Sequence, residues 1–145
     1  MLPVITIDSG AGLTSIETGP AITRTATIYT GQGRFGTNPF DDFELFREQS
    51  PITYVRTKDT AILMYHGTAD GLCPWMGAIE FYNALRFNRK YAILLSYPKE
   101  GHGLGKLENR KDLTVRMQQF FEHHLMDKPA PDWMINGVPF LKKKQ

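Results

Sequence analysis

The sequence predicts an α/β fold in which a parallel sheet carries helices on its faces. Two short, unbroken apolar runs, Ala61–Tyr65 and Tyr91–Leu95, are typical of strands that are covered on both faces. A stretch with apolar residues at helical spacing follows each run, so the order is strand, helix, strand, helix. With short loops this order is a βαβ unit, which gives parallel strands and a right-handed crossover. Two strands alone do not make a stable parallel sheet, and we expect about one more from the first sixty residues, so the sheet is incomplete.

The part of the chain before these strands carries weaker signals. Residues 1–30 are expected to be irregular or to form short strands, because they are rich in Thr and Gly and show little periodicity. A short helix is expected from Asp41 or Asp42, with an aspartate as its N-cap. It ends at Ser50, because the residue before a proline is pushed out of the helical region.

The two helices of the βαβ pattern have recognisable boundaries. Pro74 stands where the first turn of a helix tolerates a proline. The helix after it has an apolar stripe formed by Trp75, Ile79, Tyr82 and Leu85. A second amphipathic helix is expected over roughly residues 108–125, and the prolines of Lys128–Pro131 end it.

Composition and charge exclude several function classes. The chain has 145 residues, 41% hydrophobic and 22% charged, as in an ordinary globular domain. Residues 141–145 form a basic tail, and without its three lysines 14 basic side chains stand against 15 acidic ones, so no nucleic-acid-binding face is expected. The longest apolar runs have five residues, whereas a membrane span needs about 20. The single Cys73 excludes an intramolecular disulfide.

Polar loops follow both predicted strands, and they carry Asp70 and His102. The carboxyl ends of adjacent parallel strands meet at one edge of a sheet, so we expect these two side chains to lie close together. A carboxylate that accepts the imidazole Nδ1–H fixes the tautomer and leaves the other nitrogen to take a proton from a nucleophile. Gly101 and Gly103 let the loop bend sharply around the imidazole. The sequence therefore predicts an acid–base pair.

The same residues could instead have purely structural roles. Asp70 also stands in a common turn sequence, and a lone loop histidine such as His102 is often structural. His66 is expected to be a structural residue at the end of a strand. His123 and His124 are expected in the last turn of a helix, where a partly positive side chain suits the helix dipole. No metal or other cofactor is predicted, because no Cys/His ligand spacing supports a site at these histidines.

The sequence offers no recognisable nucleophile for the pair. A nucleophile elbow has the pattern G-x-S-x-G on a strand-to-helix turn. None of the four serines lies in that pattern: Ser9, Ser15, Ser50 and Ser96. Cys73 follows the aspartate loop, but its neighbours are Leu72 and Pro74, which do not form an elbow.

Several motifs occur in a specific order and spacing within residues 31–140. They are His66–Gly71 followed by Pro74-Trp75, Tyr97–His102, Asn109–Asp112 with Arg116–Phe121, Pro129–Trp133, and Gly137–Pro139. In this order they resemble the last third of the serine peptidases of the prolyl oligopeptidase family.

The resemblance implies that residues 31–140 are the C-terminal portion of an α/β-hydrolase domain with a triad in the order Ser, Asp, His. Asp70 would be the acid and His102 the general base, while the serine and the oxyanion donors would lie upstream, in a part of the domain that this sequence does not contain. We therefore expect a fragment of a peptidase that cleaves peptides, inactive alone. An uncovered strand edge and apolar face would then favour self-association or pairing with the missing part.

Two other functions stay open at this point. One is an acyl or carbohydrate esterase of the same fold, because nothing in Asp70 or His102 reports the leaving group. The other is a binding or assembly module that keeps the fold without the chemistry.

Overall fold

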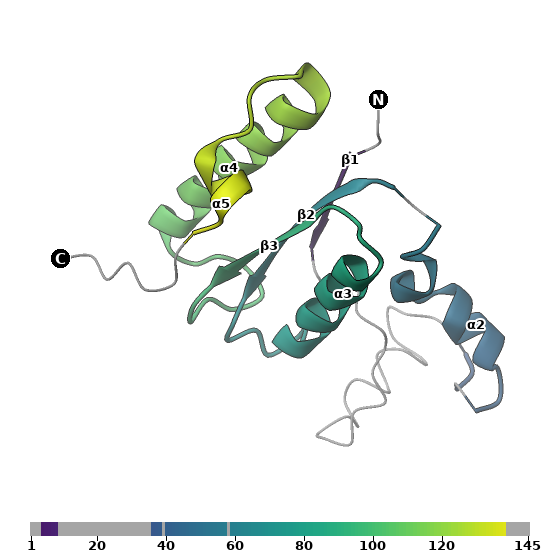
Figure 1. Ribbon diagram of the computed structural model, residues 1–145. Helices are drawn as coiled ribbons and strands as arrows, with labels where there is room; N and C mark the ends of the chain where they lie inside the picture. Colours follow the sequence, from purple (N-terminus) through teal and green to yellow (C-terminus); the bar gives the residue numbers. More distant parts are fainter. Residues whose placement is uncertain (1–3, 9–35, 39, 58, 139–145) are drawn as a thin grey trace.

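The computed structural model describes residues 4–8, 36–38, 40–57 and 59–138 (Figure 1). One sheet is formed by three parallel strands: β1 (Val4–Asp8), β2 (Ala61–Gly67) and β3 (Ala92–Tyr97). Their order in the sheet is their order in the chain, with β2 in the centre. Because the strands are parallel, all three end at the same edge of the sheet.

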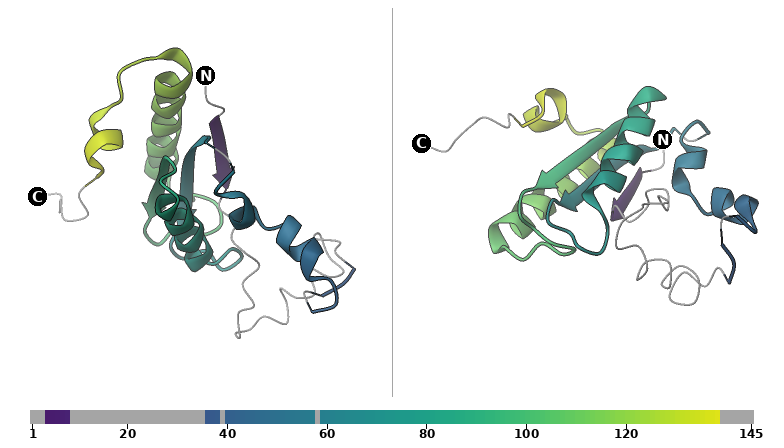
Figure 2. Two further views of the ribbon diagram at one scale, coloured as in Figure 1. Left: turned by 45° about the vertical axis from the view of Figure 1, so that its right-hand side comes forward. Right: turned by 90° about the horizontal axis from the view of Figure 1, so that it is seen from below.

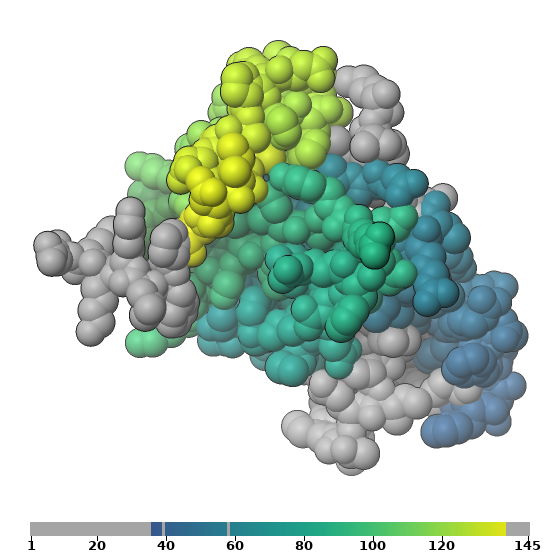
Figure 3. Space-filling model, in the orientation of Figure 1, coloured from purple at the N-terminus to yellow at the C-terminus, as the bar shows by residue number. Residues whose placement is uncertain are grey.

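Helices cover both faces of this sheet (Figures 1 and 2). The helix α3 (Trp75–Phe87) lies on one face and α4 (Leu107–Met126) on the other. A short helix, α5 (Asp132–Asn136), folds back onto α4 (Figure 3). Trp133 Nε1 donates a hydrogen bond of 2.6 Å to Gln119 Oε1 on α4. Before β2 the chain forms α2 (Phe43–Glu48) and the 3₁₀ helix η1 (Pro51–Tyr54).

The hydrophobic core is divided into two clusters, one on each side of β2. The α3 side contains Val55, Ile62, Met64, Phe81 and Leu85. The α4 side contains Ala61, Leu63 and Phe120. Successive residues of β2 thus point to opposite faces, with the two-residue period of a strand. Coverage of both faces explains why this strand is an unbroken apolar run in the sequence.

The described elements begin and end close to the predicted positions. Asp42 is the N-cap of α2, and its carboxylate accepts a hydrogen bond of 3.0 Å from the N–H of Leu45. Both predicted strands end later than expected, since their last residues still pair with each other; Gly67 lies opposite Tyr97. His66 is therefore part of β2 rather than of the turn that follows.

The buried stripe of α3 differs from the predicted one. Its buried residues are Ala78, Phe81 and Leu85. Ile79 and Tyr82 are only half-buried. The small side chain of Ala78 is 1% exposed, so the helix rests on the sheet along a slightly rotated face.

One further strand is expected from the first sixty residues, and the structure places it at Val4–Asp8. These five residues form β1, which pairs with Ala61–Tyr65. Their valine, isoleucines and threonine are β-branched and favour strands, but the run is too short to show a period. The rest of residues 1–30 and the basic tail 141–145 lie outside the described residues. Among the described helices, none has the length and apolar character of a membrane span.

Candidate active site

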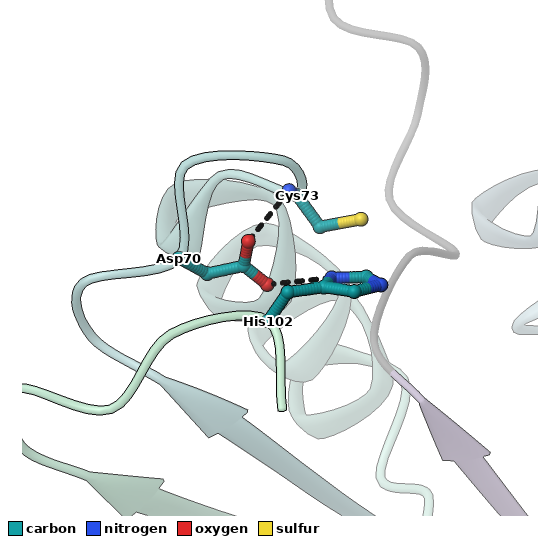
Figure 4. Close-up of side chains that lie close together, drawn as sticks. All are labelled: Asp70, Cys73 and His102. Carbon is teal, nitrogen blue, oxygen red and sulfur yellow. Dashed lines mark hydrogen bonds and ion pairs between the residues drawn. The ribbon is translucent and has the colours of Figure 1, made fainter. Parts of the chain in front are cut away.

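Asp70 and His102 lie together beyond the carboxyl ends of β2 and β3 (Figure 4). His102 Nδ1 is 3.1 Å from Asp70 Oδ2, and since a carboxylate only accepts, the imidazole donates. The other ring nitrogen points away from the carboxylate (Figure 4). The side chain of Asp70 is 5% exposed and that of His102 is 48% exposed. The pair thus sets a buried carboxylate behind an accessible imidazole.

Backbone hydrogen bonds fix the Asp70 carboxylate. Its Oδ1 accepts from the N–H of Leu72 at 2.8 Å and from that of Cys73 at 3.0 Å. Burial raises the pKa of Asp70, but the hydrogen bonds from Cys73, Leu72 and His102 together outweigh it, so the pKa lies below its ordinary value of 3.8. Asp70 is therefore ionised at neutral pH.

The loop that carries Asp70 is hydrogen-bonded to the loop that carries His102. The N–H of Thr68 donates to Tyr97 O at 3.1 Å, and the N–H of Ala69 donates to Glu100 O at 2.9 Å. In the opposite direction, the N–H of Lys99 donates to Thr68 Oγ1 at 3.0 Å. These three bonds set the separation of the two loops.

A glycine lets the two loops approach each other. A Cβ on Gly67 would lie 2.3 Å from Gly101 O and 2.4 Å from Glu100 O, far inside van der Waals contact. Both obstacles are backbone atoms, which cannot swing aside as a side chain can. Any other residue at position 67 would push the His102 loop outward.

The His102 loop is anchored at its start by Glu100, which is 4% exposed. Its carboxylate accepts from the N–H groups of Gly105 (2.6 Å) and Lys106 (3.3 Å) and from the side-chain amide of Asn109 (2.5 Å), all at the beginning of α4. The hydrogen bonds from Asn109 and Gly105 hold the pKa of Glu100 below its ordinary value of 4.5. The loop is thus tied to α4 as well as to the Asp70 loop.

His66 is a buried neighbour of Asp70 on β2. Its side chain is 1% exposed and packs on Trp75, with ring centroids 5.4 Å apart. Its Nδ1 donates to Gly67 O at 2.7 Å, since a carbonyl can only accept. Its Nε2 lies 3.9 Å from Asp70 Oδ2 and has no hydrogen-bond partner among the described residues.

The serines do not complete the pair within the described part of the chain. Ser50 is buried and donates to Phe46 O at 2.6 Å, and Ser96 lies within β3. Ser9 and Ser15 fall outside the described residues. The remaining histidines, His123 and His124, lie in the last turn of α4, where the sequence predicted them.

Cys73 also lies at the pair, in the turn that follows Asp70. One ligand atom each from Asp70, Cys73 and His102 lie within 4.8 Å of one another (Figure 4). The signal in the sequence for this placement is the short turn between Asp70 and Cys73. In that turn the backbone N–H of Cys73 donates to the Asp70 carboxylate. The role of Glu100 as an anchor of the loop was not predicted. The signal in the sequence is a carboxylate two residues before His102.

A sequence model of the prolyl oligopeptidase family matches residues 11–128. The acylamino-acid-releasing enzyme of Rattus norvegicus is 28% identical over 123 residues, which make up 85% of this chain and 16% of that enzyme. An acylaminoacyl peptidase of Pyrococcus horikoshii has a TM-score of 0.62 at 22% identity, over 79% of this chain and 20% of its own. A puromycin-hydrolysing peptidase of Mycobacterium tuberculosis has a TM-score of 0.60 at 23% identity, over 70% and 16% of the two chains.

These matches agree with the fold described above. The solved structures are α/β-hydrolase peptidases, so the parallel sheet with helices on both faces is part of that fold, as the sequence predicted. The chain spans about a sixth of the length of its curated relative from rat. Because the family match extends over most of its length, this chain belongs to the prolyl oligopeptidase family.

Proposed function

We propose that this chain supplies the acid and the general base of a serine-peptidase triad, Asp70 and His102. The nucleophilic serine comes from residues outside this sequence. The observation that carries the proposal is the 3.1 Å contact between Asp70 Oδ2 and His102 Nδ1, with the second imidazole nitrogen accessible. Family membership supports the same assignment, since the triad acid and base follow the serine in this class of fold.

In the proposed reaction each group has one task. The serine hydroxyl attacks the carbonyl carbon of the scissile peptide bond, and His102 Nε2 takes the hydroxyl proton. Asp70 keeps its charge and stabilises the imidazolium that forms. When the C–N bond breaks, the imidazolium gives its proton to the leaving amine. Water then hydrolyses the acyl-serine by the same proton path.

The first substrate to try is a peptide with an N-acylated amino-terminal residue. Two of the matched proteins are an acylamino-acid-releasing enzyme and an acylaminoacyl peptidase. The proposed products are the acylamino acid and the shortened peptide.

The 145-residue chain by itself is proposed to be inactive and to pair with the remainder of the domain or with itself. None of its serines lies in a nucleophile elbow. Near the site, Leu72 is 68% exposed and Met76 is 54% exposed, and Phe43 on α2 is 65% exposed. Apolar side chains left open in this way favour burial against a partner surface.

The test uses the native polypeptide, captured from source cells with an antibody to residues 126–145. The proposal expects a polypeptide well above 16.5 kDa that a fluorophosphonate labels and that releases acylamino acids from an acylated peptide. Hydrolysis of acyl esters with no peptide cleavage would instead establish an esterase. If the polypeptide is not labelled and hydrolyses neither substrate, the proposal is wrong and the chain is part of a binding module.

The purified 145-residue chain is the matched control. It is expected to remain unlabelled by the same fluorophosphonate. Labelling together with turnover by this chain alone would contradict the need for an external serine.

A further inference from the structure

Three kinds of metal ligand meet at the site: a carboxylate from Asp70, a thiol from Cys73 and an imidazole from His102 (Figure 4). Among the described residues, this is where three such ligand atoms come within 4.8 Å of one another. The Asp70 and His102 atoms are already 3.1 Å apart. Two ligands of one tetrahedral zinc ion, with bonds of about 2.0 Å, are separated by about 3.3 Å. The two atoms are now joined by a hydrogen bond, and for both to bind one ion they have to separate by only about 0.2 Å while the imidazole turns.

The thiol is close enough to complete the set. A sulfur at about 2.3 Å from zinc lies about 3.5 Å from a nitrogen ligand of the same ion, so the distance from the Cys73 sulfur to the nitrogen has to shorten by at most about 1.3 Å. Cys73 is partly exposed.

We propose that Asp70, Cys73 and His102 bind Zn²⁺. Thiolate and imidazole ligands together favour zinc over magnesium or calcium, which prefer sites made of oxygen atoms. Three protein ligands leave a fourth position for water, as in open zinc sites. The half-exposed imidazole gives the ion access from solvent, and the charge of the buried Asp70 attracts it.

His66 supplies an independent reason to expect a cation beside Asp70. Because its Nδ1–H donates to Gly67 O, the Nε2 of the neutral imidazole carries a lone pair. That lone pair is buried, lies 3.9 Å from Asp70 Oδ2 and has no hydrogen-bond partner in the described part of the chain. A buried polar atom without a partner commonly marks the place of a water molecule or an ion.

Zinc at this position would regulate the proposed peptidase. An ion that holds both the imidazole and the carboxylate removes them from proton transfer, so bound zinc inhibits. This consequence rests on the proposed function, whereas metal binding itself does not. Binding displaces the thiol proton and moves the Nδ1 proton of the neutral imidazole to Nε2, so one proton is released to solvent and the affinity rises with pH.

The experiment is a titration of the purified 145-residue chain with Co²⁺ and Zn²⁺. Cobalt is expected to bind with one equivalent and to give the near-ultraviolet absorption of a cobalt–thiolate bond, which zinc then displaces. Cys73→Ser should abolish this absorption, and both Cys73→Ser and His102→Gln should weaken zinc binding at least about tenfold. The matched control His123→Gln, on α4, should bind as the unaltered chain does.

Absence of the thiolate absorption in the unaltered chain, or unchanged zinc affinity of Cys73→Ser, overturns the proposal. If a variant fails to fold, as judged by circular dichroism, the cobalt–thiolate absorption of the unaltered chain still tests the proposal. Zinc should protect Cys73 from alkylation by iodoacetamide, and an equal rate with and without zinc overturns the proposal.

Inhibition is tested on the antibody-captured polypeptide. Hydrolysis that zinc suppresses and a chelator restores supports the regulatory role. Hydrolysis that continues with zinc present at levels that saturate the isolated chain overturns that role alone. Zinc binding by a polypeptide without hydrolytic activity overturns the proposed function and leaves the metal site standing.

Discussion

The backbone N–H of Ala69 donates to the carbonyl oxygen of Glu100 at 2.9 Å and joins the Asp70 loop to the His102 loop. The distance between the carboxylate and the imidazole is therefore set by main-chain atoms. Side-chain rotation alone cannot separate the two loops. Changes in the main chain near this bond should disturb the pair more than changes at exposed side chains.

Gly67→Ala is the most direct test of that arrangement. The added Cβ would overlap with the carbonyl oxygens of Gly101 and Glu100, so the loops must move apart. We expect the free energy of unfolding to fall by about 1–3 kcal/mol, as for other overpacked positions, in urea denaturation. The control is Gly71→Ala, where a Cβ meets nothing within 4 Å. Equal losses in the two variants would contradict the role of Gly67.

Asp70→Asn tests the acid of the proposed triad. The amide keeps the shape of the side chain but loses the charge that stabilises the imidazolium and selects the tautomer. In the longer polypeptide we expect kcat to fall about 10⁴-fold, as the same change does in a characterised serine protease. Asp59→Asn serves as the control, because Asp59 is 77% exposed and pairs with Lys90. A kcat within a factor of about two of the parent would exclude Asp70 as the acid, since that ratio is under 0.5 kcal/mol.

Acid should destabilise the fold through carboxylates held by hydrogen bonds. In the folded chain the pKa of Glu100 lies below its ordinary value of 4.5, and the pKa values of Asp70 and Asp112 lie below their ordinary value of 3.8. A carboxylate with a depressed pKa stabilises the folded state at any pH above its ordinary pKa. This stabilisation is lost as the pH falls through the lower pKa of the folded state. We therefore expect Tm to decline below about pH 4.5.

Glu100→Gln separates this anchor from the other carboxylates. At neutral pH its Tm should be lower than that of the parent, because a neutral amide accepts the N–H bonds at the start of α4 more weakly. The difference should shrink in acid, where both side chains are uncharged. Glu80→Gln, an exposed change on α3, is the control. A difference in Tm that is constant with pH would refute the charged anchor.

Phe120→Ala should cost about 3–5 kcal/mol of unfolding free energy, as for buried aromatic residues elsewhere. Its side chain is fully buried between α4 and β2, in the cluster with Ala61 and Leu63. Phe87→Ala, at a position 89% exposed, should change the stability by less than about 0.5 kcal/mol. Similar values for the two variants in chemical denaturation would mean that the α4 side of the sheet is not packed as described.

The fold was predictable where the residue pattern is dictated by burial on two sides. Nearly every side chain of β2 is buried, so the strand is an uninterrupted apolar run. The Asp70–His102 pair followed from the same reasoning, because loops after adjacent parallel strands must share an edge. In contrast, β1 has only five residues, too few to show a period in an otherwise Thr- and Gly-rich segment.

The surroundings of the pair could not be predicted in the same way. The place of the Cys73 thiol depends on a turn whose shape is set by two hydrogen bonds to one Asp70 oxygen. The role of Glu100 depends on where α4 begins in space, which periodicity along α4 does not report. Both are three-dimensional consequences of loops, where sequence patterns are weakest.

The order of the strands in the sheet has a use in protein engineering. Since β2 and β3 are consecutive in the chain and adjacent in the sheet, Asp70 and His102 come from one contiguous stretch and are only 32 positions apart. Cutting a hydrolase of this type upstream of that stretch would leave the nucleophile on one polypeptide and an assembled dyad on the other. Such a two-piece enzyme would report, by turnover, whether proteins fused to its halves meet in a cell.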